Sequence, residues 1–322
     1  MRAINSSLAP DKKESALISL KKKKGLFYYI KADYILYLML IIPVAYIVTF
    51  KYAPMYGIQI AFKDYNIFQG VSMSPWNHFA TFEQIFSSPQ FYQVVRNTLV
   101  LNGLDLLVGF PAPILLAILI NELVWNKFKK VSQTILYLPH FLSWVIIGGM
   151  VAQLLSPTGM VNSLITNMGG EPLPFLTNKY AWVATYSLIG VWQNAGWGTI
   201  LYLAAMTGID KQLYEAAEAD GAGRFRKIWH ITLPGIRPTI VILLILQLGN
   251  IMAINFDRPF NIQNNLVMDF GDVISTYVYR VGIQSANFSV GAAVGLFQSV
   301  ICLVFLLTSN FISRKLGEDG IW

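Results

Sequence analysis

The chain has 322 residues, of which 55% are hydrophobic and only 13% are charged. Its mean hydropathy of +0.50 exceeds that of ordinary soluble domains and predicts a membrane protein. The single cysteine, Cys302, lies in an apolar run, which excludes a disulfide framework and any cysteine-based metal site. The net charge of +7 does not by itself indicate nucleic-acid binding, because the positive charges are placed according to the apolar runs.

The first 33 residues form a hydrophilic, basic segment that contains four consecutive lysines at 21–24. A signal peptide has a short charged region followed by a short apolar stretch and a small-residue cleavage site, and this segment does not follow that pattern. We therefore expect residues 1–33 to stay on the chain as a basic cytoplasmic tail that contacts anionic lipid.

Six stretches are apolar and long enough to cross the hydrocarbon core, which takes about 20 helical residues. They cover residues 34–52, 97–120, 132–155, 182–206, 240–256 and 290–312. Strands of an outer-membrane barrel would alternate polar and apolar residues over about 10 positions, and these stretches do not. The sequence therefore predicts an all-α membrane protein with six transmembrane helices.

Lysine and arginine are distributed unequally between the two sides of this topology. Of the 24, 18 lie in the N-terminal tail, in the loops after the second and fourth spans and at the C-terminal end. The other six lie on the opposite side or at span edges. Because cytoplasmic loops carry the excess of positive residues, we expect a multi-pass membrane protein with both termini in the cytoplasm.

The cytoplasmic loop between the fourth and fifth spans is the most polar segment in the second half of the chain. Asp210 is predicted to cap a short helix with a face of leucine and alanine. Gly221 and Gly223 interrupt this helix, and a second amphipathic stretch follows that is predicted to end at Pro234. On periodicity alone, the loop can equally be an interfacial linker whose arginines contact lipid headgroups.

The literal motifs distinguish these two interpretations. The loop holds "EAA" at 215–217, a glycine at 221 and "ITLP" at 231–234, a pattern that resembles the signature loop of permease subunits of binding-protein-dependent ABC importers. Five further segments resemble the sugar-importer branch of this family and, within it, the group that imports complex oligosaccharides. They are "NTLVLN" at 97–102, "FPAPILLAILINEL" at 110–123, "YLPHFLSW" at 137–144, "GWGTILYLAAMTGID" at 196–210 and "AVGLFQSV" at 293–300. The resemblance covers the chain from about residue 34 onward.

The resemblance implies a type I ABC importer permease fold. A first helix and external loop would occupy residues 34–92, and a five-helix core would occupy residues 93–322 and carry the coupling loop at 209–237. This loop would dock into a separate cytoplasmic ATPase, with Glu215 meeting its polar groups, the alanines allowing close approach and Gly221 allowing the turn. The coupling residues carried over are Tyr214, Glu215, Ala216, Ala217, Asp220, Gly221, Leu233 and Pro234. The implied partners are ATPase subunits, a second and non-identical permease, an extracytoplasmic solute-binding protein and membrane lipid. The implied location is the bacterial cytoplasmic (inner) membrane.

Enzymatic signatures are missing from the sequence. It has no GxxxxGK[ST] phosphate loop, so we expect ATP and magnesium to be bound by the partner ATPase and not by this chain. It has three histidines and neither an HExxH nor a GxSxG motif. We therefore predict a transport subunit with no catalytic residues, no metal site, no cofactor of its own and no nucleic-acid partner.

Polar residues inside the spans are candidates for a substrate pathway, because an ionised Asp costs about 3 kcal/mol at a helix centre. Asp105 and His140 both approach the midplane, and we expect them to face the interior and to interact, as a packing pair or as ligand contacts. Sugars are bound by planar polar groups and aromatic faces, which adds six candidates: Trp192, Gln193, Asn194 and Trp197 on the fourth span, and Asn250 and Asn255 on the fifth. Each of these can instead serve helix packing.

Together these features predict a permease subunit of an ATP-driven oligosaccharide importer that works by alternating access. One alternative is a permease of the same fold for another solute, such as a peptide or an amino acid. The other is a channel or sensor component without ATP coupling. The external loops 53–92 and 257–287 are long enough to meet the binding protein. No residue in the sequence identifies the sugar, its charge or its length.

Overall fold

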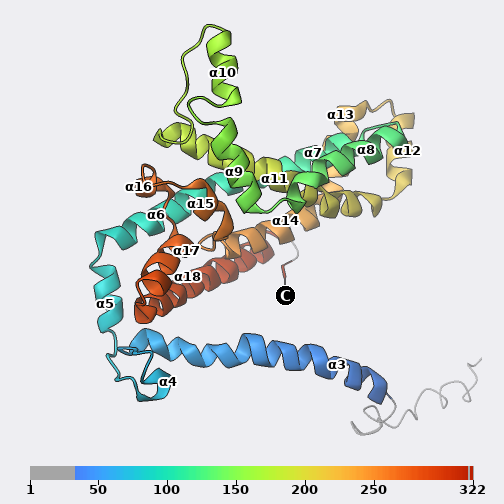
Figure 1. The fold of residues 1–322 in the computed structure, drawn as a ribbon. Helices are drawn as coiled ribbons and strands as arrows, with labels where there is room; N and C mark the ends of the chain where they lie inside the picture. Colours follow the sequence, from blue (N-terminus) through green and yellow to red (C-terminus); the bar gives the residue numbers. More distant parts are fainter. Residues whose placement is uncertain (1–32, 318–319, 322) are drawn as a thin grey trace, which may run out of the picture. The chain divides into compact units, whose positions relative to one another are not determined.

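The computed structural model describes residues 33–317 and 320–321, and the chain divides into two compact units, Met1–Gly57 and Ile58–Trp322. The described part of the first unit contains helix α3 (Tyr34–Ile47), the π-helical turn η1 (Val48–Tyr52) and the start of the 3-10 helix η2 (Ala53–Phe62), whose last five residues belong to the second unit (Figure 1). None of the α3 side chains is buried. This exposure suits a membrane span, because lipid tails are as apolar as its side chains.

The second unit is built from helices joined by short loops, and in its described residues the extended pairing is limited to one isolated bridge between Lys63 and Trp76. Its helices up to the polar loop are α4 (Gly70–Met73), α5 (Ala80–Phe86), α6 (Pro89–Leu104), η3 (Asp105–Gly109), α7 (Pro111–Asn121), α8 (Asn126–Tyr137), η4 (Leu138–Phe141), α9 (Trp144–Leu154), α10 (Met160–Asn167) and α11 (Lys179–Thr207). The remaining helices are α12 (Lys211–Ala219), α13 (Arg224–Lys227), η5 (Ile228–Thr232), α14 (Leu233–Gly249), α15 (Asp257–Ile262), α16 (Met268–Gly271), α17 (Ile274–Tyr277), η6 (Val278–Gln284) and α18 (Phe288–Lys315).

Each of the six predicted spans coincides with a helix or a pair of helices. Four continuous helices within the described residues are long and apolar enough to cross a membrane: Tyr34–Phe62, Pro89–Asn121, Arg224–Gly249 and Phe288–Lys315. A fifth span is formed if the pair Asn126–Phe141 and Trp144–Leu154, bent by 96°, counts as one. The predicted fourth span is α11, which is 29 residues long but less uniformly apolar.

Helix α11 is more polar than the other spans because it lies in the interior of the second unit. It packs against α7, η3, α14 and η4, and it buries polar as well as apolar side chains along its length. The buried polar residues include Thr185, Gln193 and Thr199. A helix covered by other helices can carry polar groups that a lipid-facing helix cannot, because neighbouring helices satisfy them.

The third span was predicted as one straight stretch, and the structure bends it sharply. Pro139 lies in the 3-10 helix η4, after which Leu142 and Ser143 are extended. The hydroxyl of Ser143 then accepts a hydrogen bond from the amide of Ile146, which starts α9. These two extended residues separate η4 from α9, so the chain changes direction here instead of continuing one helix.

The expected boundaries of the fifth span are also wrong. Pro234 does not end the preceding helix but lies in the first turn of α14, where its missing amide hydrogen costs nothing. The π-helical turn η5 precedes it, so the helix runs without a break from Arg224 to Gly249. The span ends at Gly249 and not at residue 256, which places Asn255 in the loop before α15.

Three apolar clusters hold the second unit together. The first joins α5 and α6 to α17 and α18 and includes Phe91 and Val294. The second surrounds Trp182 and Tyr186 near the start of α11, and the third surrounds Tyr202 and Met206 near its end. The stretch of α11 between the second and third clusters is therefore the part that is free to line an internal space.

The close approach of α11 to α8 generates a test of this packing. A Cβ at Gly196 would lie 1.9 Å from the backbone oxygen of Leu136, whereas a Cβ at Gly103 in α6 would meet nothing within 4 Å. We expect Gly196→Ala to destabilise the protein by about 2 kcal/mol, because the two helices must move apart. Gly103→Ala should be neutral or slightly stabilising. Thermal unfolding midpoints of the detergent-extracted proteins measure both, and equal midpoints would contradict the close contact between α11 and α8.

Candidate functional site

The polar loop between α11 and α14 folds into two short helices that meet at a tight turn. The carboxylate of Asp210 accepts a hydrogen bond from the amide of Gln212 at 2.9 Å and caps α12, as predicted. At the other end of α12, the amide of Ala222 donates to the carbonyl of Ala217 at 2.8 Å and the amide of Gly221 donates to that of Glu218 at 3.0 Å. These two bonds form a Schellman motif, in which the residue after the helix adopts a left-handed conformation. Gly221 has φ of +74°, which confirms that this glycine permits the turn.

Two side-chain contacts hold the hairpin closed on either side of this turn. The ammonium group of Lys227 lies 2.5 Å from a carboxylate oxygen of Glu218, and the hydroxyls of Tyr214 and Thr232 are 2.9 Å apart. The hydrogen bond from Lys227, together with its charge, lowers the pKa of the Glu218 carboxyl group. The ion pair is therefore formed at neutral pH and is lost only when pH falls through this lowered pKa.

The eight predicted coupling residues all lie on this hairpin or at its junction with α14. Glu215, Ala216 and Asp220 are exposed and available to a partner, while Leu233 packs into the third apolar cluster. The hairpin also exposes Phe225, which is 89% accessible. An exposed aromatic side chain suits a docking surface, because aromatic residues are enriched at protein–protein interfaces.

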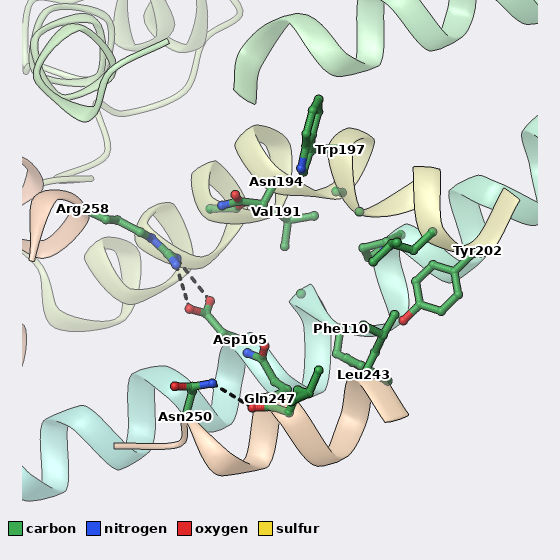
Figure 2. Close-up of a pocket in the computed structure, with 17 residues that line it drawn as sticks. Asp105, Phe110, Val191, Asn194, Trp197, Tyr202, Leu243, Gln247, Asn250 and Arg258 are labelled. Atoms are coloured by element: carbon green, nitrogen blue, oxygen red, sulfur yellow. Dashed lines mark hydrogen bonds and ion pairs between the residues drawn. The ribbon is translucent and has the colours of Figure 1, made fainter. Parts of the chain in front are cut away.

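Two cavities lie beside the middle of α11. The first has a volume of about 490 Å³, and the second has a volume of about 380 Å³. Figure 2 shows the first cavity, with Asn194 and Trp197 contributed by α11 and Gln247 and Asn250 by the end of α14. The apolar part of the first cavity is supplied by residues such as Leu243.

A buried ion pair lies where the two cavities meet. The guanidinium group of Arg258 donates to both carboxylate oxygens of Asp105, at 2.7 and 3.2 Å (Figure 2). It also donates to the carbonyl of Tyr186 at 2.5 Å. It lies 3.7 Å from the centre of the Tyr186 ring. Asp105 begins the π-helical turn η3, and Arg258 projects from α15, so the pair joins elements far apart in sequence.

The predicted contact between Asp105 and His140 is absent from the described interactions, and each residue has another partner. Asp105 binds Arg258, because an intramembrane carboxylate is best stabilised by a fixed positive charge. His140 stacks on Trp197 instead, with the ring centres 4.6 Å apart and the planes within 3°. Both predicted residues still line the second cavity.

Seven of the eight predicted pathway residues line one or both cavities. Asp105, Asn194, Trp197 and Asn250 line the first, and Asp105, His140, Gln193, Asn194 and Asn255 line the second. The exception is Trp192, which lines neither cavity.

Sequence reasoning missed Arg258, Tyr186 and Gln247. Arg258 is one of the six positive residues that the charge count assigns to the outer side or to span edges. A deep acid such as Asp105 implies a cationic partner, and this signal could have pointed to Arg258. Tyr186 and Gln247 carried no signal of this kind, because aromatic and amide residues are common in packed spans.

Four buried polar atoms that face this region have no hydrogen-bond partner among the described residues. They are Nδ1 of His140, the hydroxyl of Tyr186, Oε1 of Gln193 and Nε of Arg258, and all four residues line the second cavity. Buried polar groups are normally satisfied, so this cavity is suited to a polar ligand or to water. The described residues contain no group of three His, Cys, Asp or Glu side chains able to hold a metal ion.

Comparison with known protein families assigns the chain to one of them. Residues 109–318 match the model for the binding-protein-dependent transport system inner membrane component. The chain belongs to this family. It is therefore a multi-pass inner-membrane permease component, and the prediction of a transport subunit rather than an enzyme is confirmed.

Similar permeases align along nearly the whole chain. The polygalacturonan/rhamnogalacturonan transport system permease protein YteP of Bacillus subtilis is 44% identical over 94% of this chain and 94% of its own. Protein LplB of the same organism is 40% identical over 97% of this chain and 99% of its own. One similar solved structure is a bacterial alginate ABC transporter in complex with an alginate pentasaccharide-bound periplasmic protein. The matching chain is 41% identical with a TM-score of 0.85, and the match covers 92% of this chain and 100% of that one. The expected type I permease fold is confirmed.

The hairpin turn generates a test of ATPase docking. Gly221→Ala places a Cβ in the left-handed region at a cost of about 1–2 kcal/mol. We expect the ATPase retained by the purified permease to be bound about 5- to 30-fold more weakly. Gly223→Ala is the matched control, since Gly223 has φ of −68° and open space around its Cβ position. The affinity is measured by titrating the ATPase onto each permease variant in detergent. If Gly221→Ala and Gly223→Ala weaken binding equally, the left-handed turn at Gly221 is not what docking depends on.

Proposed function

We propose that this chain is the permease subunit of an ATP-driven importer for oligosaccharides, and that its substrates are fragments of an acidic polysaccharide. The observation that carries the proposal is the pair of cavities beside α11, which hold amide, aromatic and ionised side chains and lie between two apolar clusters of the second unit. The names of its relatives support the substrate class, since one serves polygalacturonan and rhamnogalacturonan transport and another belongs to an alginate importer. A peptide or amino acid as the substrate has no comparable support.

The cavities offer the two kinds of surface that a sugar needs. Trp197 lines the first cavity and His140 lines the second, so each cavity has an aromatic ring that can pack on the apolar face of a pyranose ring. Amide side chains, such as Asn194, Gln247 and Asn250, offer donors and acceptors to hydroxyl groups. Because these groups lie on α11 and α14, relative movement of the two helices would change the shape of the site.

Energy would come from partner subunits. The hairpin of α12 and α13 would dock in a cytoplasmic ATPase that binds ATP and magnesium, with Glu215 and Asp220 facing its polar groups. Closure of two ATPase subunits would move this hairpin, and the continuous helix Arg224–Gly249 would carry the movement to Gln247 and Asn250 at the cavity. This arrangement supports alternating access, in which a packed interface changes between two states.

The remaining partners and the topology follow from the same proposal. Both termini would lie in the cytoplasm, with the first module at 34–92 preceding the five-helix core at 93–322. The external loops of the second unit would meet the solute-binding protein, and the first of them exposes Phe68, Met73 and Trp76. A second, non-identical permease would complete the pathway.

Two tryptophans on α11 provide a matched test of the pathway. Trp197 lines the first cavity and Trp192 lines neither, although their exposed fractions are similar at 43% and 49%. We expect Trp197→Ala to raise the KM for oligosaccharide uptake about fivefold, because the sugar loses an aromatic surface. Trp192→Ala should leave KM within twofold of the unchanged protein. The opposite order of effects would contradict the placement of the pathway.

The function itself is tested by reconstitution. The chain, its paired permease, the ATPase and the binding protein are placed in proteoliposomes, and ATP-dependent uptake of labelled oligogalacturonate is measured beside that of a peptide of similar length. We expect uptake of the saccharide alone, together with stimulation of ATP hydrolysis by the loaded binding protein. ATP-dependent uptake of the peptide, or no uptake of any oligosaccharide, would refute the proposal.

A further inference from the structure

Arg258 lies at the junction of the two cavities. Of the residues that line them, only Asp105, Asn194 and Arg258 are common to both. These three side chains therefore lie at the boundary between the two cavities. Two of the three are ionised and bound to each other.

The guanidinium group is held rigidly but is not saturated. Its three hydrogen bonds, two to Asp105 and one to the carbonyl of Tyr186, use three of the five N–H groups of an arginine. The Nε–H is buried without a partner among the described residues, and Arg258 lines the second cavity. Gly190 makes room for this arrangement, because a Cβ there would lie 2.3 Å from the guanidinium carbon. Arg258 thus keeps donor capacity at a fixed position.

The charge of the site is balanced when it is empty. Among the described residues, Asp105 and Arg258 are the only Asp, Glu, Lys or Arg side chains that line either cavity. The side chain of Asp105 is 20% exposed and that of Arg258 is 10% exposed, so the carboxylate is the more accessible partner. A buried arginine without a counter-ion would be costly, and Asp105 removes this cost in the absence of substrate.

A carboxylate on the substrate can take the place of Asp105, whereas a neutral sugar cannot. The planar guanidinium group matches a carboxylate in a bidentate manner. If Asp105 is displaced, amide groups of Asn194, Gln247 and Asn250 line the same cavity and can donate to it. Exchange of one carboxylate for another leaves the arginine paired throughout, which keeps the energetic cost of passage small.

We propose that Arg258 binds the carboxylate of a uronate unit as it passes between the two cavities, and that Asp105 is the counter-ion that holds Arg258 neutralised between substrates. This inference rests on the proposed function and adds to it the residue that determines the charge of the substrate. Asp105 and Arg258 together form a gate that an anionic oligosaccharide opens by exchange.

The test compares one oligosaccharide with and without its charge. Equilibrium binding of an oligogalacturonate and of its fully methyl-esterified form is measured on the purified complex without binding protein, and preference is the ratio of the two Kd values. We expect the unchanged complex to prefer the acid by about tenfold or more, as hydrogen bonds to charged groups are worth this much. Arg258→Gln should bring the ratio close to one.

Asp105→Asn should act in the opposite direction. Without its counter-ion, Arg258 should bind the acid several-fold more tightly, while the ester is little affected. The double variant Asp105→Asn/Arg258→Gln leaves no unpaired charge, so it provides a variant that folds if Arg258→Gln does not. It should also lose the preference for the acid over the ester. Retention of the ATPase on size-exclusion chromatography verifies the assembly of each variant.

Arg280→Gln is the matched control, because Arg280 forms a comparable ion pair with Asp272 and lines neither cavity. It should leave the preference unchanged. An unchanged preference in Arg258→Gln or in the double variant, or no preference in the unchanged complex, would overturn the inference. Proteoliposome uptake separates this result from failure of the proposed function, since a complex that imports oligosaccharide without depending on Arg258 refutes only the inference.

Discussion

The structure depends on the need to satisfy polar groups away from water. Inside a membrane protein, an ionised side chain is tolerated only where another group neutralises it, and the bidentate pair of Asp105 and Arg258 meets this condition. The pair connects η3, which follows α6, to α15, and its third bond reaches Tyr186 on α11. Three segments distant in sequence are thereby brought to one point, and the two cavities form on either side of it.

The same constraint explains why α11 differs from the other spans. It is surrounded by helices of its own unit, and its Gly190 and Gly196 allow Arg258 and α8 to approach closely. Polar residues that lipid would exclude can therefore lie along it. A helix of this kind places amide and aromatic groups in the membrane interior, where a hydrophilic substrate has to pass.

The cytoplasmic hairpin illustrates the opposite situation. Many of its side chains meet water, and its shape depends on the left-handed Gly221, on the backbone bonds that close the end of α12 and on two side-chain contacts across the turn. Its second half is continuous with α14, and the resulting helix of 26 residues is about 39 Å long. One end lies at the predicted ATPase contact and the other at the cavity, so a single helix connects the two sites.

The sequence by itself determined the local features. The length of the apolar runs located all six spans, and most of their boundaries lie within several residues of the observed ones. The capping residue Asp210 and the turn residue Gly221 were recognised because caps and left-handed turns depend on the residue type at one position. The literal loop motif identified the family. These inferences succeed because each depends on neighbouring residues along the chain.

Only the tertiary structure decided which distant residues meet. Asp105 pairs with Arg258, 153 positions away, and His140 stacks on Trp197, whereas depth in the membrane alone had suggested that Asp105 and His140 interact. Depth gives one coordinate, and contact depends also on the rotation of each helix about its axis and on bends such as the one at Pro139. Those quantities are set by packing between segments, which is why the cavities and their charged gate emerge only from the folded chain.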